Sequence, residues 1–440
     1  INLLYAQDET VFIPIEQANL VQRYIGNEGE APRLDIIGSK AWENRKNKVK
    51  KSVEDIADKL IDLYSRRKAA AGFAFAKDNE WQTAFEAAFP YEETEDQLTC
   101  IADVKADMED AREMIADLIG ARYNEIYFTS GGSEANNWAI LKACELMENK
   151  GKHIISSKIE HHSVLHTLSY LEKRGYEVTY LSTDEKGIID INELKDAIRD
   201  DTVLISIMFA NNEIGTIQPI KEIGKIAHEH NILFHTDAVQ AVGHLPIDVN
   251  ELNIDLLSAS GHKFHSPKGV GFLYIRSGIK LTSLIHGGSQ ERNRRSGTEN
   301  TFGIIAMANA LKNCYKSLEK DSLYVKSLRD KLFSLILENI EGSHINGDIK
   351  NRLFNNINIY FENISGELLL ILLNQNGVCA SLGSACTTGS IDPSHVIMAV
   401  SNDKKRASSS LRLTLSKYNT EDEVNKTFEI LKSSIEKLRG

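Results

Sequence analysis

The sequence is poor in cysteine, and its cysteines are not spaced as a metal site or a disulfide framework. It has an odd number of them and no C-x-x-C pair, so neither a zinc site nor a set of disulfide bonds is expected. The five residues are Cys100, Cys144, Cys314, Cys379 and Cys386. Reduced thiols in a cytoplasmic protein fit this pattern best.

Long apolar runs are also absent. No stretch of about 18 apolar residues is present that could span a membrane. The first residues lack the basic region and apolar core of a signal peptide, and because the chain does not begin with Met we expect its natural start to lie upstream. The formal net charge of −11 gives no global affinity for nucleic acid.

One motif is conspicuously missing as well. The sequence contains no G-x-x-x-x-G-K-[ST] loop. Nothing would therefore cradle the phosphates of a nucleotide, and we expect no ATPase activity from the purified protein.

The 440 residues are enough for two or three domains, and the hydrophobic pattern changes near residue 109. Before it lies a β-like run at residues 11–15. Residues 39–70 then carry apolar side chains at three- and four-residue steps among charged ones, which predicts one long helix with a solvated, charged face.

From residue 109 short apolar runs alternate with helical patterns, which predicts an α/β domain with a mostly parallel sheet and helices on both faces. A long helix is expected from residue 301 to about 340, followed by a smaller α+β unit. The predicted strands cover residues 126–129, 153–156, 178–181, 203–208, 233–236, 256–260, 272–275, 357–361, 378–380 and 411–415. The predicted helices cover residues 110–118, 134–147, 163–173, 191–198, 220–228, 367–373 and a last segment from 421.

Polar side chains follow the ends of these strands, where ligands bind in sheets of this kind. Gly132 and Ser133 follow the first strand and open a helix, which suits a phosphate group and equally an ordinary capped helix. His161 and His162 follow the second strand. Because no thiolate or carboxylate set accompanies them, stacking on a planar cofactor is favoured over a metal site, and a core histidine is the alternative.

Two later strands end in an amide and a carboxylate. Asn212 suits a phenolic oxygen, and Gln240 lies one helical turn after Asp237. A buried carboxylate beside a pyridine ring would keep the ring nitrogen protonated and make the ring an electron sink. A single Asp after a strand is also typical of a helix cap.

The sixth strand leads into a lysine. Ser260 and His262 precede Lys263 and are suited to donate hydrogen bonds to an anion. A lysine held beside other cationic groups can lose its proton and form a Schiff base with an aldehyde, whereas a lone lysine here would lie in a surface turn. Lysine, pyridinium partner, stacking group, oxygen donor and phosphate cup together match the needs of a pyridoxal phosphate enzyme.

Two further residues come from the last part of the chain. Cys386 lies in a loop of glycine, serine and threonine without apolar periodicity, which indicates an exposed, reactive thiol rather than a buried one. Cys379 ends an apolar run and is expected to be buried. Arg412, in a strand-like run, suits bidentate binding of a carboxylate or lies on a surface strand.

From about residue 109 to its end, the chain resembles the cysteine desulfurases of the NifS/IscS type within the aminotransferase class V family. The matching motifs cover roughly three-quarters of the chain. They are T-S-G-G-S-E-A-N-N at 129–137, E-H-H at 160–162, N-N-E-I-G at 211–215, H-T-D-A-V-Q at 235–240, S-G-H-K at 260–263, H-G-G-S-Q-E-R at 286–292, R-S-G-T-E-N at 295–300 and G-S-A-C at 383–386.

The resemblance implies fold type I of the pyridoxal 5'-phosphate (PLP) enzymes, in a homodimer. Lys263 would hold PLP, Asp237 would pair with its ring nitrogen, and His161 would stack on the ring and move protons. Asn212 and Gln240 would lie near the ring oxygen. The phosphate would be bound by Gly132, Ser133, Ser260 and His262, with Thr298 from the partner subunit.

The resemblance also implies the reaction. Asn212 and Arg412 would bind the substrate L-cysteine, and Cys386 would take its sulfur as a persulfide and release L-alanine. The sulfur would pass to an acceptor or to an iron–sulfur scaffold protein. Another class V aminotransferase or a selenocysteine lyase is the alternative enzyme, and a non-catalytic module that contacts RNA polymerase is the alternative outside enzymology.

Residues 1–108 resemble a different protein, part of a bacterial transcription-repair coupling factor. The likeness lies in the charged helix after G-S-K-A-W at 38–42, in G-F-A-F at 72–75 and in F-P-Y-E-E-T-E-D-Q-L at 89–98, and it implies contact with RNA polymerase. The family's usual opening, with sequences like D-N-A-A-T-T and G-N-P-S-S-x-H, is absent.

We interpret the chain as a junction of two unrelated genes, natural or from assembly, joined near Met108, which sequencing a genomic clone across residues 100–115 would test. The expected domains are 1–108, a PLP-binding large domain at 109–300, and a linking helix with a small domain carrying the cysteine loop at 301–440.

Overall fold

A computed structural model describes residues 2–4, 10–12, 40, 94–383 and 393–440. The chain divides into two compact units, Ile1–Glu92 and Glu93–Gly440. In the first unit, strands β1 (Asn2–Leu4) and β2 (Thr10–Phe12) pair antiparallel, close to the predicted β-like run. Most of the helix predicted over residues 39–70 lies outside the described residues.

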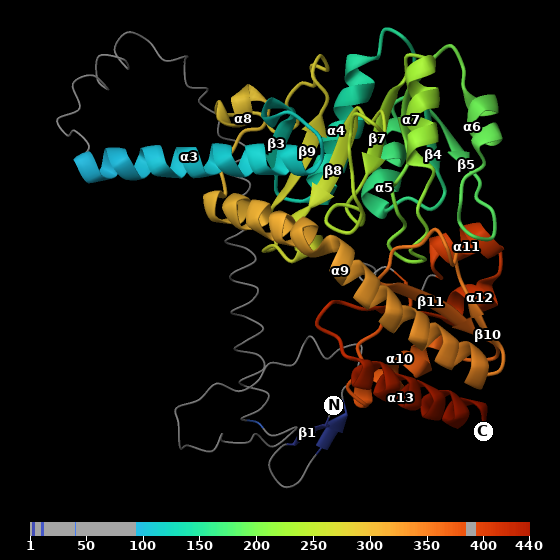
Figure 1. Ribbon diagram of the computed structural model, residues 1–440. Coiled ribbons are helices and arrows are strands. Elements are labelled where there is room, and N and C mark those ends of the chain that lie inside the picture. Colours follow the sequence, from blue (N-terminus) through green and yellow to red (C-terminus); the bar gives the residue numbers. More distant parts are fainter. Residues whose placement is uncertain (1, 5–9, 13–39, 41–93, 384–392) are drawn as a thin grey trace, which may run out of the picture. The chain divides into compact units, whose positions relative to one another are not determined.

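The second unit is built on a seven-stranded sheet in the order β3-β9-β8-β7-β6-β4-β5 (Figure 1). Strands β4 to β8 are parallel, whereas β9 is antiparallel to both of its neighbours, β3 and β8. The prediction of a mostly parallel α/β sheet is confirmed. The strands are β3 (Ile126–Thr129), β4 (His153–Ser157), β5 (Glu177–Leu181), β6 (Thr202–Ser206), β7 (Leu233–Asp237), β8 (Leu256–Ser260) and β9 (Gly271–Ile275).

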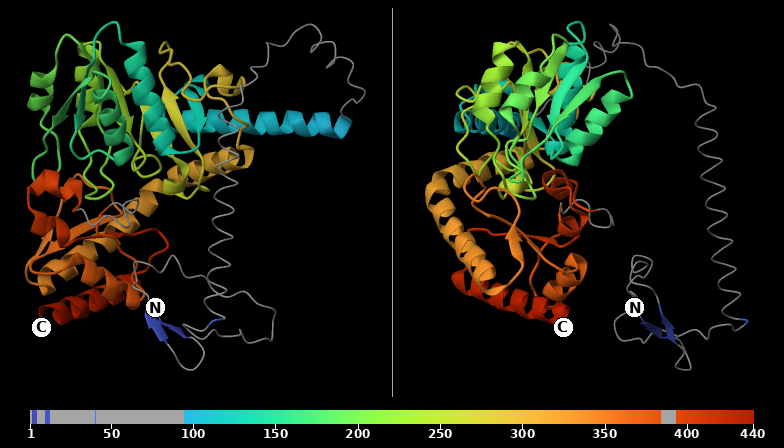
Figure 2. Two further views of the ribbon diagram at one scale, coloured as in Figure 1. Left: turned by 180° about the vertical axis from the view of Figure 1, so that it is seen from behind. Right: turned by 90° about the vertical axis from the view of Figure 1, so that its right-hand side faces the viewer.

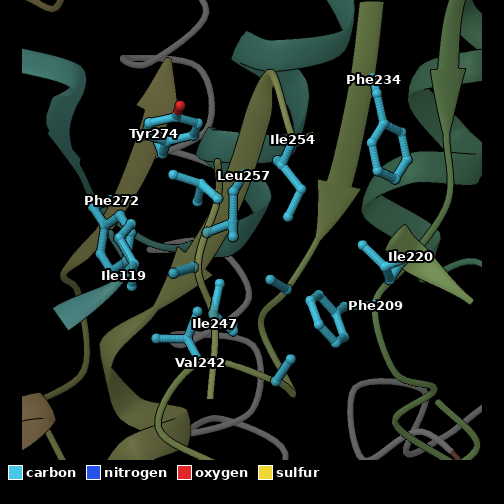
Figure 3. Packing of buried hydrophobic residues seen from close by; sticks show 14 of the residues in the cluster. Ile119, Phe209, Ile220, Phe234, Val242, Ile247, Ile254, Leu257, Phe272 and Tyr274 are labelled. Atoms are coloured by element: carbon cyan, nitrogen blue, oxygen red, sulfur yellow. The ribbon is translucent and has the colours of Figure 1, made fainter. Parts of the chain in front are cut away.

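Alternate residues of the central strands enter two separate apolar clusters, because successive side chains of a strand point to opposite faces. Leu257 and Phe272 belong to the cluster on one face, and Leu256 and Leu273 to the cluster on the other. Figure 3 shows the first of these clusters. Helices therefore cover both faces of the sheet: α4 (Gly132–Leu146) and α5 (His162–Glu172) on one, and α6 (Ile191–Ala197) and α7 (Ile220–Glu229) on the other.

Helix α3 (Glu95–Leu118) spans the predicted junction without a break. Thr94 caps its start, since the Thr94 hydroxyl accepts from the Gln97 N–H while the Gln97 side chain accepts from the Thr94 N–H. Its first half is mostly exposed and projects beyond the sheet (Figures 1 and 2), whereas Ile115 and Ala116 are buried in the core. The boundary at residue 108 stays a prediction.

Helix α9 (Thr301–Asn339) runs from the large domain into a small one (Figures 1 and 2). There an antiparallel sheet in the order β10-β11-β12 packs with helices around its own apolar cluster. The elements are β10 (Ser343–Ile345), β11 (Asn356–Phe361), α10 (Gly366–Gln375), α11 (His395–Ser401), α12 (Lys404–Ser408), β12 (Ser410–Thr414) and α13 (Glu421–Arg439). Among the described residues, no helix has both the length and the apolar character to cross a bilayer.

Two predictions for the small domain are wrong. Residues 378–380 form no strand, because the Val378 N–H donates to the Leu373 carbonyl and closes the end of α10, so that only Ser381 bridges to Arg412. Cys379, expected to be buried, is exposed. Short elements such as β10, α11 and α12 were not predicted, because too few residues carry a periodic pattern.

Candidate active site

The turn between β3 and α4 forms a cradle that admits no side chain. A Cβ on Gly132 would lie 2.6 Å from Val239 Cγ2, and Gly131 has a φ of +152°. No side chain caps α4 in the part of the chain that the structure describes, and Gly131 rather than Ser133 is the N-cap residue. This favours the anion-site interpretation over the capped-helix one, since the first N–H groups of a helix attract negative charge.

Strand β8 brings a second set of donors to the same turn. A Cβ on Gly131 would lie 3.5 Å from Ser260 Oγ, and that hydroxyl is 3.0 Å from His262 Nδ1. Burial and the charges of nearby lysines lower the pKa of His262. The half-buried Lys263 follows in the short 3₁₀ turn Gly261–Phe264. The structure thus places Gly132 near Ser260, whose hydroxyl meets His262, and Lys263 lies in the turn that follows.

Asp237 is the last residue of β7 and is held by two donors. Its Oδ2 accepts from Asn136 Nδ2 at 2.7 Å and its Oδ1 from the Val239 N–H at 3.0 Å. The same Asn136 amide donates to Ser163 Oγ at 2.9 Å, so the carboxylate is tied to both α4 and α5. Asp237 is 5% exposed, and no helix follows it directly, which argues against a plain helix cap.

His161 stands immediately before α5 and caps it. Its Nδ1 accepts from the Ser163 N–H at 3.1 Å, so the proton of the neutral ring resides on Nε2. Burial lowers the pKa of His161, the Asp237 charge opposes this, and the Lys263 charge adds to it. The structure therefore supplies a neutral imidazole electrostatically coupled to Asp237 and Lys263.

Three other histidines gather beside His161. The ring of His162 lies 5.1 Å from that of His166 and 4.6 Å from that of His395, between centroids. Among the described residues, however, no group of three or more His, Cys, Asp or Glu side chains could hold a metal ion. A cavity of about 510 Å³ opens here, and its lining includes Ser133, His161, His162, His166 and Tyr170.

The turn after β6 contacts the small domain through Asn212. Arg412 on β12 donates from Nη1 to the Asn212 carbonyl at 2.8 Å, so these two predicted substrate-binding residues lie together. Gln240 is half-buried in the turn after β7, and Thr298 is exposed. Thr298 and Ser130 of the same chain line a small cavity of about 100 Å³. Cys386 lies outside the described residues.

Sequence reasoning missed two buried residues beside the site. Asn136 was part of a motif but carried no assigned role. Glu160 is fully buried, and its Oε1 accepts from Ser157 Oγ at 2.6 Å and the Met208 N–H at 3.0 Å. Burial raises the pKa of this carboxyl to about 8. Its only signal in the sequence was its place between a strand end and His161.

These residues fit PLP. The cradle at Gly132 suits a phosphate, Asp237 suits a pyridinium, and Lys263 offers an amine. Asn136 Oδ1 and Thr236 Oγ1 are buried without hydrogen-bond partners among the described residues, as expected around a polar ligand. A mostly parallel sheet with this site and a small C-terminal domain defines a PLP-dependent enzyme of fold type I.

Comparison with known proteins gives the family. The family model described as "Aminotransferase class-V" matches residues 94–427, and the chain belongs to that family. A cysteine desulfurase IscS of Methanosarcina thermophila is 54% identical over 330 residues, which are 75% of this chain and 81% of the relative. The same enzyme of Dictyoglomus turgidum is 52% identical over 332 residues, 76% of this chain and 84% of the relative.

Solved structures agree with this assignment. A NifS-like protein superposes with a TM-score of 0.72 at 38% identity, over 76% of this chain and 89% of that one. A structure of SspA in complex with cysteine superposes with a TM-score of 0.64 at 40% identity, over 73% of this chain and 89% of that one.

Proposed function

We propose that this protein is a PLP-dependent cysteine desulfurase, which releases L-alanine from L-cysteine and retains the sulfur as a persulfide on Cys386. The observation that carries the proposal is the identity of about half of all aligned residues to enzymes of that name. The glycine cradle after β3, the buried Asp237 at the end of β7 and Lys263 after β8 support the proposal, because they suit the chemistry that the reaction needs.

Each part of PLP would be held by a different set of residues. When bound, PLP supplies a ring that accepts electrons from the substrate. Lys263 would hold it, Asp237 would hold a proton on its ring nitrogen, and Asn212 and Gln240 would lie near its ring oxygen. The phosphate would be bound by Gly132, Ser133, Ser260 and His262.

Two further residues act on the substrate. His161, whose neutral ring carries its proton on Nε2, can donate a hydrogen bond from Nε2, and it would help to move protons only through its protonated, imidazolium form. Arg412, with Asn212 beside it, would bind the substrate carboxylate. The neutral form of His161 is favoured because burial lowers its pKa, so its contribution should persist at pH 7.

An absorbance scan of the purified protein tests the cofactor. We expect a near-visible band that borohydride removes and that the Lys263→Ala variant lacks. A colourless protein that takes up no added pyridoxal phosphate would refute the proposal. Cys386→Ala separates the enzyme classes, because an aminotransferase should keep its turnover whereas a desulfurase should stop producing sulfide.

We also propose a homodimer that delivers sulfur to an acceptor or iron–sulfur scaffold protein. Apolar side chains are exposed around the segment that carries Thr298: Phe302 is 75% exposed and Ile285 is 39% exposed. Such side chains gather where subunits meet. Thr298 would then reach the phosphate of the partner subunit.

For residues 1–108 we propose an origin in a transcription-repair coupling factor and a contact with RNA polymerase, which a pull-down with polymerase would test. The support is the sequence resemblance alone, because nearly all of these residues before 94 lie outside the described part of the chain. The free thiols of Cys100, Cys144, Cys314 and Cys379 support a reducing compartment such as the cytoplasm.

A further inference from the structure

The buried side chain of Asn136 on α4 is hydrogen-bonded to one residue proposed to hold PLP, Asp237, and indirectly to a second, His161. Asn136 is 1% exposed, and its Nδ2 donates to Asp237 Oδ2 at 2.7 Å and to Ser163 Oγ at 2.9 Å. Because a carboxylate only accepts hydrogen bonds, the nitrogen of the amide and not its oxygen must face Asp237. The orientation of the amide is thereby fixed, and both of its hydrogens are used.

Ser163, near the start of α5, carries the connection on to His161. Its hydroxyl oxygen accepts from Asn136, so the single hydroxyl hydrogen is left for His161 Nδ1, which lies 2.8 Å away. The Ser163 N–H donates to the same ring nitrogen at 3.1 Å. A continuous hydrogen-bonded chain therefore runs from Asp237 through Asn136 and Ser163 to the imidazole, and it leaves the ring proton on Nε2.

The hydrogen bonding of Asn136 argues against a role in packing alone. Its Oδ1 is buried and has no partner among the residues that the structure describes, although leaving a buried acceptor unpaired costs free energy. A buried amide that only fills a core is expected to have its oxygen paired as well, and Asn346 in the small domain shows that pattern. Its Nδ2 donates to Asn358 Oδ1 at 2.7 Å and to Ser410 Oγ at 2.9 Å, and its Oδ1 accepts from Arg406 Nε at 2.7 Å. The placement of Asn136 therefore follows its two donor contacts at the site.

We propose that Asn136 is a positioning residue of the site, whose amide holds the Asp237 carboxylate and, through Ser163, keeps the proton of His161 on Nε2. A hydrogen bond donated to a carboxylate favours its charged form, and a charged Asp237 is the form that keeps a pyridine nitrogen protonated. A hydrogen bond donated to Nδ1 favours the neutral imidazole over the imidazolium for the same reason. This inference rests on the proposed function, because it takes Asp237 and His161 as residues that hold PLP.

The first test measures the His161 ring by NMR in the full chain, with histidine labelled in ¹⁵N and with PLP present or removed. The signal of His161 is identified by its absence in His161→Gln. We expect the wild-type ring to carry its proton on Nε2, and the pKa of His161 to be higher in Ser163→Ala and in Asn136→Leu, because the first variant removes the hydroxyl donor to Nδ1 and the second no longer directs it there. Ser163→Ala deletes one oxygen and keeps the packing, so an unchanged pKa of His161 in that variant would overturn the link.

The second test separates the two ends of the hydrogen-bonded chain by PLP affinity, measured by absorbance titration of the PLP-free protein. Asn136→Leu has a similar size but no donor, and it should weaken PLP binding about tenfold, the loss of roughly one hydrogen bond to a charged group. Asn136→Ala removes the same donor without a branched carbon chain and should show the same loss. Ser163→Ala should bind PLP within about twofold of wild type, because Asp237 keeps its donor.

Asn346→Leu is the matched control, because it removes a buried amide whose two donor contacts have the same lengths. It should lower the urea midpoint and leave both the His161 signal and the PLP affinity unchanged. If wild type takes up no PLP, the proposed function fails, whereas the NMR titration still tests the hydrogen-bonded chain. If wild type binds PLP and both Asn136 variants bind it equally well, or if Asn346→Leu weakens binding as much as they do, the positioning role is refuted.

Discussion

Several polar side chains beside the site are buried in their neutral forms. His235 bridges Ser206 and Ser258 across three neighbouring strands, at 2.9 and 3.0 Å from its two ring nitrogens, and burial lowers its pKa to about 3. Glu160 is the acidic counterpart, with one oxygen that has no partner among the described residues. Because His235 and Glu160 are neutral, they can hydrogen-bond neighbouring strands without placing another charge near Asp237.

Glu160→Gln should remove a pH dependence of stability. The folded protein keeps the Glu160 proton until its pKa of about 8, whereas the ordinary value is 4.5. Between these values the folded state binds more protons than the unfolded state, so this carboxyl makes the free energy of unfolding fall as pH rises. Gln has the shape of the neutral acid and does not ionise.

We therefore expect Glu160→Gln and wild type to have similar urea midpoints at pH 5, and the variant to be more stable at pH 9 by an amount on the order of a few kcal/mol. Urea unfolding at both pH values measures this difference. Glu429 is exposed on α13, and Glu429→Gln is the control. The difference in urea midpoint between Glu429→Gln and wild type should be the same at pH 5 and pH 9. The expectation would be contradicted if the stability difference between Glu160→Gln and wild type were the same at pH 5 and at pH 9.

At the scale of elements, α3 is tied to the core by a buried ion pair with an unusual partner. Arg112 donates to both oxygens of Glu291, at 2.8 and 3.0 Å, and Glu291 Oε2 also accepts from the Phe128 N–H at 2.9 Å. Glu291, Arg292 and Asn293 all have left-handed backbones, with φ of 46°, 57° and 63°. Three such non-glycine residues in a row are costly, and the bidentate pair holds the first of them in place.

Arg112→Met should destabilise the protein by about 3–5 kcal/mol, because it leaves the Glu291 carboxylate buried without its cation. The urea midpoint measures the loss. Adding Glu291→Gln should recover part of it, since the amide oxygen still accepts from Phe128 without a charge. Arg199→Met, which removes exposed ion pairs with Asp201 and Glu177, is the control and should shift the midpoint little. A variant as stable as that control would rule out the anchoring role of Arg112.

At the scale of the whole molecule, the proposed homodimer depends on the surface around the start of α9. Phe302→Asp places a charge on that surface and should shift the protein from dimer to monomer, which light scattering or sedimentation would detect. Leu323→Asp is a matched control, because Leu323 is 63% exposed on the same helix but lies about 31 Å further along it. The proposed interface would be refuted if wild type were a monomer, or if Phe302→Asp and Leu323→Asp dissociated the dimer to the same extent.

The large domain was predictable because most of its strands are buried along their whole length. Strand β3 begins with three apolar residues and β8 continues the apolar run that starts at Ile254, and both strands were predicted at their observed bounds. Small-domain elements carry weaker signals. Residues 378–380 look like a strand, yet the end of α10 takes the Val378 N–H, and nothing local reveals that competition.

The sequence by itself determined the order of chemical groups at the strand ends, from Gly132 to Lys263, because parallel strands deliver those ends to one edge of the sheet. Only the tertiary structure decided which groups meet. The bonds from Asn136 to Asp237 and from Ser394 to Glu213 join residues far apart in the chain. Burial, which raises the pKa of Glu160 and lowers that of His235, is likewise a property of the packed protein, since desolvation requires surrounding residues that the local sequence does not specify.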